Sequence, residues 1–179
     1  MNIKKLIENA EAGDMKAQSS LSCLYREGDG VPQDDEKAFY WVKKAAAQGC
    51  TTSQYNLGYF YWSGKGTLED YEKAFFWFSL AAEKGHAKAQ NYLGAMYSSG
   101  RGVDENFEEA YIWLSIAAKQ NHPNAQCRLA LMYINGNGVP ESLSEAAHWA
   151  NLAYKQGSEF AAEMMDEYEL WDYIETYYI

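Results

Sequence analysis

The amino-acid sequence predicts an all-α solenoid, in which helix pairs repeat along the chain and each pair packs mainly on its neighbours. The glycines of a Gly-x-Gly turn recur every 36 residues, and so does a tryptophan, without insertion or deletion. These residues are Gly28, Gly64, Gly100 and Gly136, then Gly30, Gly66, Gly102 and Gly138, then Trp41, Trp77, Trp113 and Trp149. The period predicts four full repeats, 13–48, 49–84, 85–120 and 121–156, with half-repeats at both ends, in a single domain over residues 1–179.

The first helix of each repeat is predicted from a small residue, a leucine and a tyrosine at offsets of four, which lie on one helix face. These packing residues are Ala17, Leu21 and Tyr25, then Ser53, Leu57 and Tyr61, then Ala89, Leu93 and Tyr97, then Ala125, Leu129 and Tyr133. We expect the helix to end at the Gly-x-Gly turn, because glycine tolerates the positive φ of a left-handed helix stop.

The second helix of each repeat is predicted to begin after a good N-cap residue, which is Asp34, Asp70, Asn106 or Ser142. Its packing face carries the alanines Ala38, Ala74, Ala110 and Ala146 and the four tryptophans, which we expect in the core. The helix ends at Gly49, Gly85, Asn121 or Gly157. Because asparagine tolerates the left-handed conformation next best after glycine, Asn121 is expected to form a C-terminal cap.

Half-repeats are predicted at both ends of the chain. Residues 1–12 correspond to a second helix that caps one end. Residues 157–179 begin as a first helix that covers the last full repeat and continue as a tail, with 7 acidic and no basic residues. As a continuous helix this segment places Met164, Tyr168, Trp171 and Ile174 on one side. Such an amphipathic face either docks on the last repeat or binds a partner.

Composition and charge exclude several classes of function. With 25 acidic and 15 basic residues the net charge is −10, which disfavours nucleic acid and favours a protein partner with a basic surface. No apolar run is long enough to span a membrane, and the N-terminus lacks the apolar core of a signal peptide. The three cysteines occupy different positions of the repeat and do not form a disulfide framework, so we expect a cytoplasmic protein.

Four short motifs mark the repeats. They are Gly-Asp-x-x-Ala-Gln-x-x-Leu at 13–21, Leu-Gly-x-x-Tyr at 57–61 and 93–97, the Gly-x-Gly-Val turns, and Lys-Ala-x-x-Trp at 73–77. Together they resemble the Sel1-like repeat (SLR) family, which is related to tetratricopeptide repeats, over about residues 6–165. The resemblance implies a right-handed α-solenoid superhelix of antiparallel helix pairs, whose first helices line a concave, protein-binding groove.

The resemblance implies a non-catalytic interaction module that acts as an adaptor or scaffold, and some family members are immunity proteins that neutralise a secreted toxin. The alternative is an enzyme, because cysteine-rich relatives are reported to bind or hydrolyse β-lactams. This chain departs from those relatives, since no repeat contains two cysteines. No serine or cysteine is spaced to pair with His148 as a general base. We therefore predict no catalytic residues and no cofactor.

Partner-binding residues are predicted where the repeats differ, on the face of the first helices opposite the leucine and the tyrosine. This face is aromatic in the second repeat, polar in the third and apolar in the fourth. Its predicted partner-binding residues are Tyr55, Tyr59, Trp62, Arg26, Lys88, Asn91, Asn124, Leu131 and Ile134. Tyr59 and Trp62 are expected to anchor the partner, because large rigid rings bury much area at little entropic cost. The alternative is that these rings pack on the neighbouring helix.

No metal site is predicted. Asp14, Cys50, His86 and His122 occupy equivalent positions in successive repeats and could be read as a ladder of metal ligands. Neighbouring helices lie about 8–10 Å apart, whereas each zinc ligand must approach the ion to about 2.0–2.3 Å. We therefore expect solvent-facing residues at helix starts. The Gly-x-Gly turns follow helices and lack the continuation of a phosphate-binding loop, so turn formation explains them.

Overall fold

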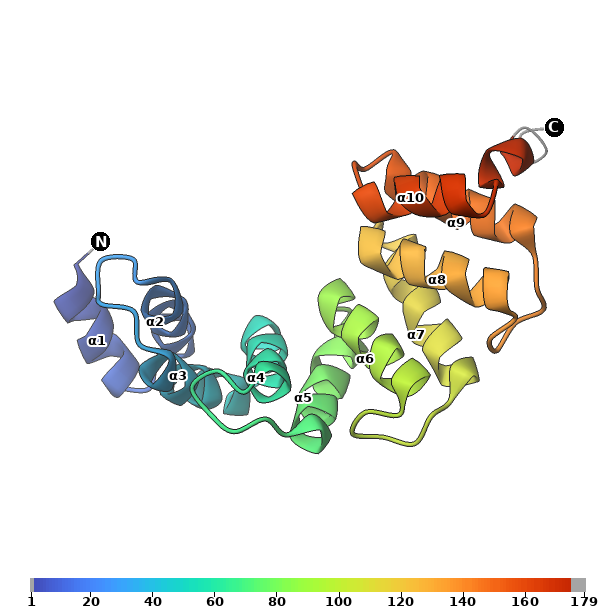
Figure 1. Ribbon diagram of the computed structural model, residues 1–179. Coiled ribbons are helices and arrows are strands. Elements are labelled where there is room, and N and C mark those ends of the chain that lie inside the picture. The colour runs from blue at the N-terminus through green and yellow to red at the C-terminus, as the bar shows by residue number, and fades with distance from the viewer. Residues whose placement is uncertain (1, 175–179) are drawn as a thin grey trace. The chain divides into compact units, whose positions relative to one another are not determined.

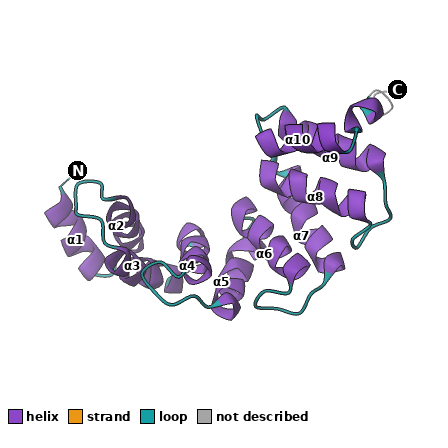
Figure 2. Ribbon diagram, viewed as in Figure 1, coloured by secondary structure: helices purple, strands orange, loops and turns teal. Residues whose placement is uncertain are grey.

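The computed structural model describes residues 2–174, and every regular element in that range is a helix (Figure 2). The chain divides into two compact units, unit 1 (Met1–His86) and unit 2 (Ala87–Ile179). The predicted all-α repeat architecture is confirmed. That the repeats form one continuous domain, with the boundaries given above, stays a prediction.

The helices of each unit follow the predicted order (Figure 1). Unit 1 contains α1 (Ile3–Glu11), α2 (Met15–Glu27), α3 (Asp35–Ala47), α4 (Thr51–Ser63) and α5 (Tyr71–Glu83). Unit 2 contains α6 (Ala87–Ser99), α7 (Phe107–Lys119), α8 (Pro123–Asn135), α9 (Leu143–Tyr154), α10 (Glu159–Glu167) and the 3-10 helix η1 (Leu170–Tyr173). The most extensive contacts join α2 to α3 and α4 to α5 in unit 1, and α6 to α7 and α8 to α9 in unit 2. Each repeat is therefore a packed helix pair.

The helices begin and end at the predicted cap residues. The side chains of the four second-helix N-caps accept hydrogen bonds of 2.9–3.2 Å from the backbone N–H three residues later. Gly28, Gly64 and Gly136 end the first helices with φ between 65° and 71°. Asn121 has a φ of 61°, so its predicted left-handed conformation is confirmed.

Alanine and leucine form the core as predicted, whereas the prediction for tryptophan was right in part. The four second-helix alanines and the four first-helix leucines are at most 1% exposed. Trp41 is buried, but Trp77, Trp113 and Trp149 are only half-buried. The fully buried position is the next one along, occupied by Val42, Phe78, Leu114 and Ala150. It lies four residues after the core alanine and continues the same helix face, whereas the indole lies at the edge of that face.

A close approach of paired helices explains the glycines within two first helices. A Cβ atom added to Gly58 would lie 2.7 Å from Cδ1 of Phe78, and one added to Gly94 would lie 2.6 Å from Cγ of Leu114. Real Cβ atoms do not approach other atoms so closely, so a large second-helix side chain requires glycine opposite it. The large side chain and the glycine opposite it are therefore matched in size in both helix pairs.

The second glycine of the turn lies against the backbone of the preceding repeat. A Cβ atom on Gly66 would lie 2.2 Å from the carbonyl oxygen of Asp35, at the start of α3. A Cβ atom on Gly138 would lie 2.6 Å from the carbonyl oxygen of Phe107, at the start of α7. Both glycines also have a positive φ, of 66° and 72°. The turn thus stops one helix and allows contact with the previous repeat.

Within each unit, a buried glutamine joins neighbouring repeats. The Nε2 atoms of Gln18, Gln54 and Gln126 donate hydrogen bonds of 3.0–3.4 Å to the carbonyl oxygens of Ala10, Ala46 and Ala118. The Oε1 atoms of Gln18, Gln54, Gln90 and Gln126 accept bonds of 2.6–3.0 Å from Gln48, Lys84, Gln120 and Gln156. Sequence analysis assigned these glutamines no role, although their recurrence every 36 residues was the available signal.

The C-terminal segment docks on the last repeat as far as residue 174. The amphipathic face described above for a continuous helix does not form, because α10 ends at Glu167 and Glu169 is left-handed, with a φ of 52°. This bend turns Leu170 into the core around α9 and α10, where it is fully buried, and leaves Trp171 39% exposed. The structure thus favours the docking alternative for this segment. The rest of the tail, residues 175–179, lies outside the described residues.

Substitution of Trp171 by alanine is expected to lower the free energy of unfolding by about 1 kcal/mol. The indole meets the ring of Tyr154 edge-on, with centroids 5.1 Å apart, and its Nε1 donates a 2.7 Å hydrogen bond to Asp166. Thermal unfolding followed by circular dichroism measures the change, with Asp172→Asn as an exposed neighbouring control. An unfolding midpoint equal to that of the control would contradict docking of this segment.

Candidate protein-binding surfaces

In unit 1 the structure brings two of the predicted partner-binding residues, Arg26 and Tyr59, into one hollow of about 90 Å³. Asp35 and Lys65 also line this hollow, so both signs of charge are present. The guanidinium of Arg26 binds Glu27 at 2.7 Å. The Oγ atom of Ser63 is buried there, with no hydrogen-bond partner in the described part of the chain. This hollow suits a small polar or charged group.

The other two aromatic residues predicted for this surface, Tyr55 and Trp62, use part of their rings inside unit 1. Tyr55 stacks on His86 with ring centroids 4.6 Å apart. Trp62 meets Tyr71 edge-on at 5.0 Å. Both residues are half-buried. The packing alternative therefore accounts for part of each ring, and the remainder lies on the surface.

Residues equivalent to Tyr55 in other repeats also contact the residue that precedes the first helix of the following repeat. At this position Ser19 accepts a 3.9 Å hydrogen bond from Sγ of Cys50, and Cys127 lies 3.6 Å from Oγ of Ser158. Asn91 occupies it in the third repeat and is 5% exposed, with no hydrogen-bond partner for its Oδ1 among residues 2–174. This predicted partner-binding residue is therefore buried at a repeat junction.

The residues considered as a metal ladder lie at helix starts, as expected. Asp14, Cys50 and His122 are the N-caps of α2, α4 and α8. Asp14 and His122 each accept a hydrogen bond from the backbone N–H three residues later, at 2.6 and 3.3 Å. Asp14 is exposed and Cys50, His86 and His122 are half-buried, so solvent reaches them less than predicted. Capping the helix is thus the role that the hydrogen bonds of Asp14 and His122 support.

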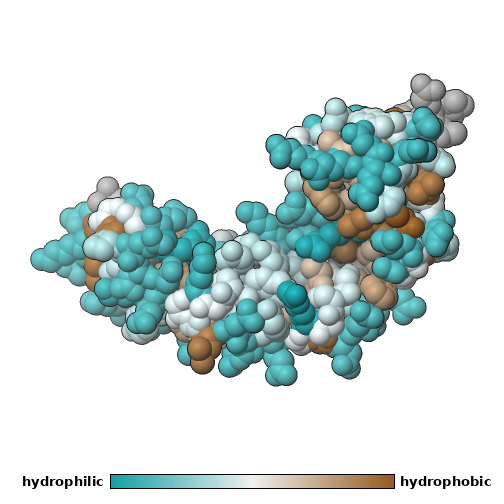
Figure 3. All heavy atoms as spheres, in the orientation of Figure 1, coloured by the Kyte–Doolittle hydropathy of each residue, from teal (hydrophilic) through white to brown (hydrophobic). Residues whose placement is uncertain are grey.

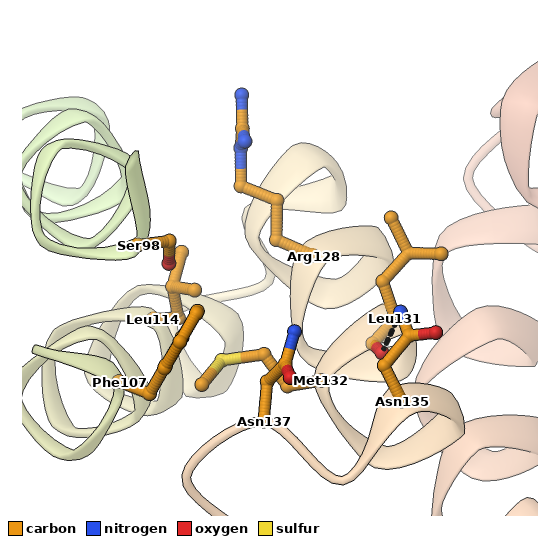
Figure 4. A pocket seen from close by; sticks show the side chains of 8 residues that line it. All are labelled: Ser98, Phe107, Leu114, Arg128, Leu131, Met132, Asn135 and Asn137. Carbon is orange, nitrogen blue, oxygen red and sulfur yellow. Dashed lines mark hydrogen bonds between the residues drawn. The ribbon is translucent and has the colours of Figure 1, made fainter. Parts of the chain in front are cut away.

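In unit 2, two surface hollows share the side chains of Arg128 and Leu131. The first, of about 270 Å³, has the apolar residues Phe107, Leu114 and Met132 in its walls (Figure 4). The second, of about 280 Å³, adds Asn124, Cys127 and Phe160. Figure 4 shows the Arg128 side chain extending away from Met132 and Asn137. The structure thus brings Asn124 and Leu131, both predicted to bind a partner, into one hollow.

The hollows of unit 2 include residues that sequence analysis missed and leave out two that it named. Lys88 is exposed, and Ile134 packs against the core around α9; neither lines these hollows. Arg128 and Phe160 were not predicted. The available signal for Arg128 was its position in the repeat, which is Ser20, Asn56 or Tyr92 elsewhere.

Acidic side chains gather on α10 and η1. Their exposed carboxylates belong to Glu159, Glu163, Asp166, Glu167 and Asp172, joined by Glu169 between the two helices. Within residues 2–174 none of them makes an ion pair. Glu169 and Asp172 line a hollow of about 350 Å³ together with Tyr168, Tyr173 and Leu143. This end of unit 2 presents an uncompensated negative surface.

The three cysteines are free thiols, and their environments differ. Burial raises the pKa of the Cys23 and Cys127 thiols, which keeps them protonated at neutral pH. Burial acts in the same direction on Cys50, but hydrogen bonds with Ser53 and Ser19 outweigh it and lower the pKa of that thiol. Across residues 2–174, no three His, Cys, Asp or Glu side chains are grouped to hold a metal ion. No helix in the same range combines the length and apolarity needed to cross a bilayer.

Helix pairs that recur every 36 residues, with Gly-x-Gly turns and buried glutamine junctions, define an α-helical repeat protein. Residues 16–50, 51–86, 87–122 and 123–158 each match the Sel1 repeat. The chain belongs to the Sel1 repeat family.

Solved structures of the same fold extend this comparison. The protective antigen c5321 of uropathogenic Escherichia coli, which displays an SLR fold, is 34% identical with a TM-score of 0.87, over 92% of this chain and 35% of its own. A Sel1 repeat protein from Oxalobacter formigenes is 33% identical with a TM-score of 0.76, over 84% of this chain and 62% of its own. This chain therefore spans about a third of the first protein and less than two thirds of the second.

A curated relative matches a shorter stretch. The Sel1-repeat-containing protein YbeQ of Escherichia coli strain K12 is 45% identical over 47 residues, which is 26% of this chain and 14% of YbeQ. The match indicates that the two proteins share this type of repeat, and it covers a small part of either protein.

Proposed function

We propose that this chain is a non-catalytic protein-interaction module, an adaptor or scaffold that binds a partner protein on the surface of its first helices. One observation carries the proposal: several residues that differ between repeats line surface hollows, whereas the core alanines and leucines that the repeats share are buried. Arg26 and Tyr59 line a hollow in unit 1, and Asn124 and Leu131 line one in unit 2. A constant core that carries a variable surface is the arrangement by which repeat proteins select partners.

The proposed partner is a protein with a basic surface, met in the cytoplasm. The net charge of −10 and the carboxylates of α10 and η1, which form no ion pair within residues 2–174, support this, because opposite charge speeds association and fixes orientation. An adaptor and a toxin-neutralising immunity protein would both act through such binding. The adaptor and the immunity protein would differ in the partner that they bind and not in the surface that they use to bind it.

Turnover of β-lactams is the competing function, and none of the contacts described above joins a serine or cysteine to a general base. We expect the purified chain to hydrolyse the chromogenic β-lactam nitrocefin no faster than the same preparation after heat inactivation. Turnover that exceeds this control, and that persists through a further purification step, would contradict the non-catalytic assignment.

Replacement of both Tyr59 and Trp62 by alanine is expected to weaken partner binding by about tenfold or more, because such rings contribute a large share of interface energy. The partner is first captured on the immobilised wild-type chain, identified and purified, and then titrated against each variant by calorimetry. Tyr40→Ala with Phe76→Ala is the matched control, since these two rings are 51% and 55% exposed and lie on second helices. Equal affinities for the two double variants would contradict the proposed surface.

A further inference from the structure

The two hollows that share Arg128 and Leu131 point to the chemistry of the bound segment, an inference that rests on the proposed function. Among the residues that the structure describes, no aspartate or glutamate lies in the walls of either hollow. This is notable because residues 87–179 contain 13 acidic and 5 basic residues. The walls around Arg128 thus lack negative charge in the more acidic half of the chain.

Arg128 has no counter-ion in the described part of the protein. Its guanidinium takes part in no ion pair and no hydrogen bond within residues 2–174. Neighbouring groups exclude water from part of the side chain, and this desolvation lowers its pKa, although the residue as a whole is exposed. A partly desolvated guanidinium is strongly stabilised by a carboxylate, which it binds through two parallel N–H···O bonds.

Apolar surface adjoins Arg128 in both hollows. The half-buried Phe107 provides it in the first hollow, whose walls also contain the buried side chains of Leu114 and Met132, and Phe160, which is 52% exposed, provides it in the second. Leu131 belongs to both. Figure 3 shows brown, apolar side chains gathered over α8 and bordered by hydrophilic ones. Apolar walls beside one cation suit apolar side chains placed beside one anion.

We propose that the surface of α8 binds an extended segment of the partner protein in which one aspartate or glutamate is flanked on both sides by aliphatic or aromatic residues. The carboxylate binds the guanidinium of Arg128, and the flanking side chains enter the two hollows on either side of Leu131. The proposal agrees with a partner that is basic overall. Long-range attraction depends on the net charge of the partner, whereas the contact with Arg128 depends on a single carboxylate.

To test this proposal, random dodecapeptides displayed on phage are selected for binding to the immobilised full chain. Enriched peptides are expected to carry Asp or Glu between apolar residues. A synthetic peptide of the enriched sequence is then titrated by fluorescence anisotropy. We expect Arg128→Gln to weaken binding about tenfold or more, and Lys119→Gln, an exposed residue with the same change of charge, to alter it less than about twofold. Replacing the acidic peptide residue by its amide should weaken binding to the wild type and not to Arg128→Gln.

Enrichment of peptides without an acidic residue, equal binding by the wild type and Arg128→Gln, or no enrichment at all would each overturn the inference. Circular dichroism of Arg128→Gln checks that the variant is folded. Capture of the whole partner tests the proposed function separately. A chain that captures a partner but selects no acidic peptide retains that function and loses this inference, and one that captures no partner loses both.

Discussion

Replacing Phe78 by alanine is expected to lower the free energy of unfolding by about 3–5 kcal/mol, the usual cost of removing a buried aromatic ring. Phe78 is fully buried on α5, and its ring lies against the backbone of Gly58 on α4. Because the other contacts between α4 and α5 hold the two helices at this spacing, the space of the ring remains as a cavity. Urea unfolding followed by circular dichroism measures the loss.

Phe76→Ala is the control for Phe78→Ala, because it removes the same side chain from the same helix. Phe76 is 55% exposed, so its loss is expected to change the free energy of unfolding by less than about 1 kcal/mol. Similar losses in the two variants would show that the ring of Phe78 does not fill the space opposite Gly58.

Replacing Gly66 by alanine is expected to lower the free energy of unfolding by about 3 kcal/mol. Two effects add: an alanine with a φ of 66° costs about 1–2 kcal/mol, and forcing an atom into a filled space costs about 1–3 kcal/mol. The new Cβ atom would lie 2.2 Å from the carbonyl oxygen of Asp35, so the turn or the start of α3 must move. The same urea titration measures the change.

Gly85→Ala separates these two effects. Gly85 has a φ of 85°, but within residues 2–174 no atom beyond Gly85 and its two chain neighbours lies within 4 Å of the place where its Cβ would be. It therefore carries the conformational cost alone, about 1–2 kcal/mol. If Gly66→Ala were no more destabilising than Gly85→Ala, close contact with the preceding repeat would not be the reason for the second glycine.

Much of the fold could be predicted because the signals for helix ends are local. Asp34 or Gly28 caps a helix through its own side chain or its own φ, so neighbouring repeats are not needed to interpret it. The core was harder, since Trp77 and Phe78 both lie near the apolar face of α5 and the close approach of α4 at Gly58 decides which is buried. The left-handed conformation of Glu169 has no signal in the neighbouring sequence, because it depends on Leu170 reaching the core.

The candidate site could be predicted less well, because each surface residue depends on the neighbouring helix. Repeat differences on one helix face selected Tyr59 and Leu131, which line hollows. The same rule selected Asn91, which is buried. It omitted Arg128, which lies outside that face and contributes to both hollows through its long side chain. The 36-residue period does not show how far a side chain reaches or which other helices form the walls of a hollow.

Repeats joined through backbone carbonyls can be gained or lost as whole units. The acceptor in each glutamine junction is the carbonyl oxygen of an alanine, Ala10, Ala46 or Ala118, and no substitution removes a carbonyl. An in-frame duplication of 36 residues would therefore supply the donor and the acceptor of the new junction together. Arg128 takes no part in these junctions, so a copied repeat could change that position without loosening the chain. In such a protein the number of repeats can therefore increase by gene duplication, and the binding surface can change later without affecting the junctions between repeats.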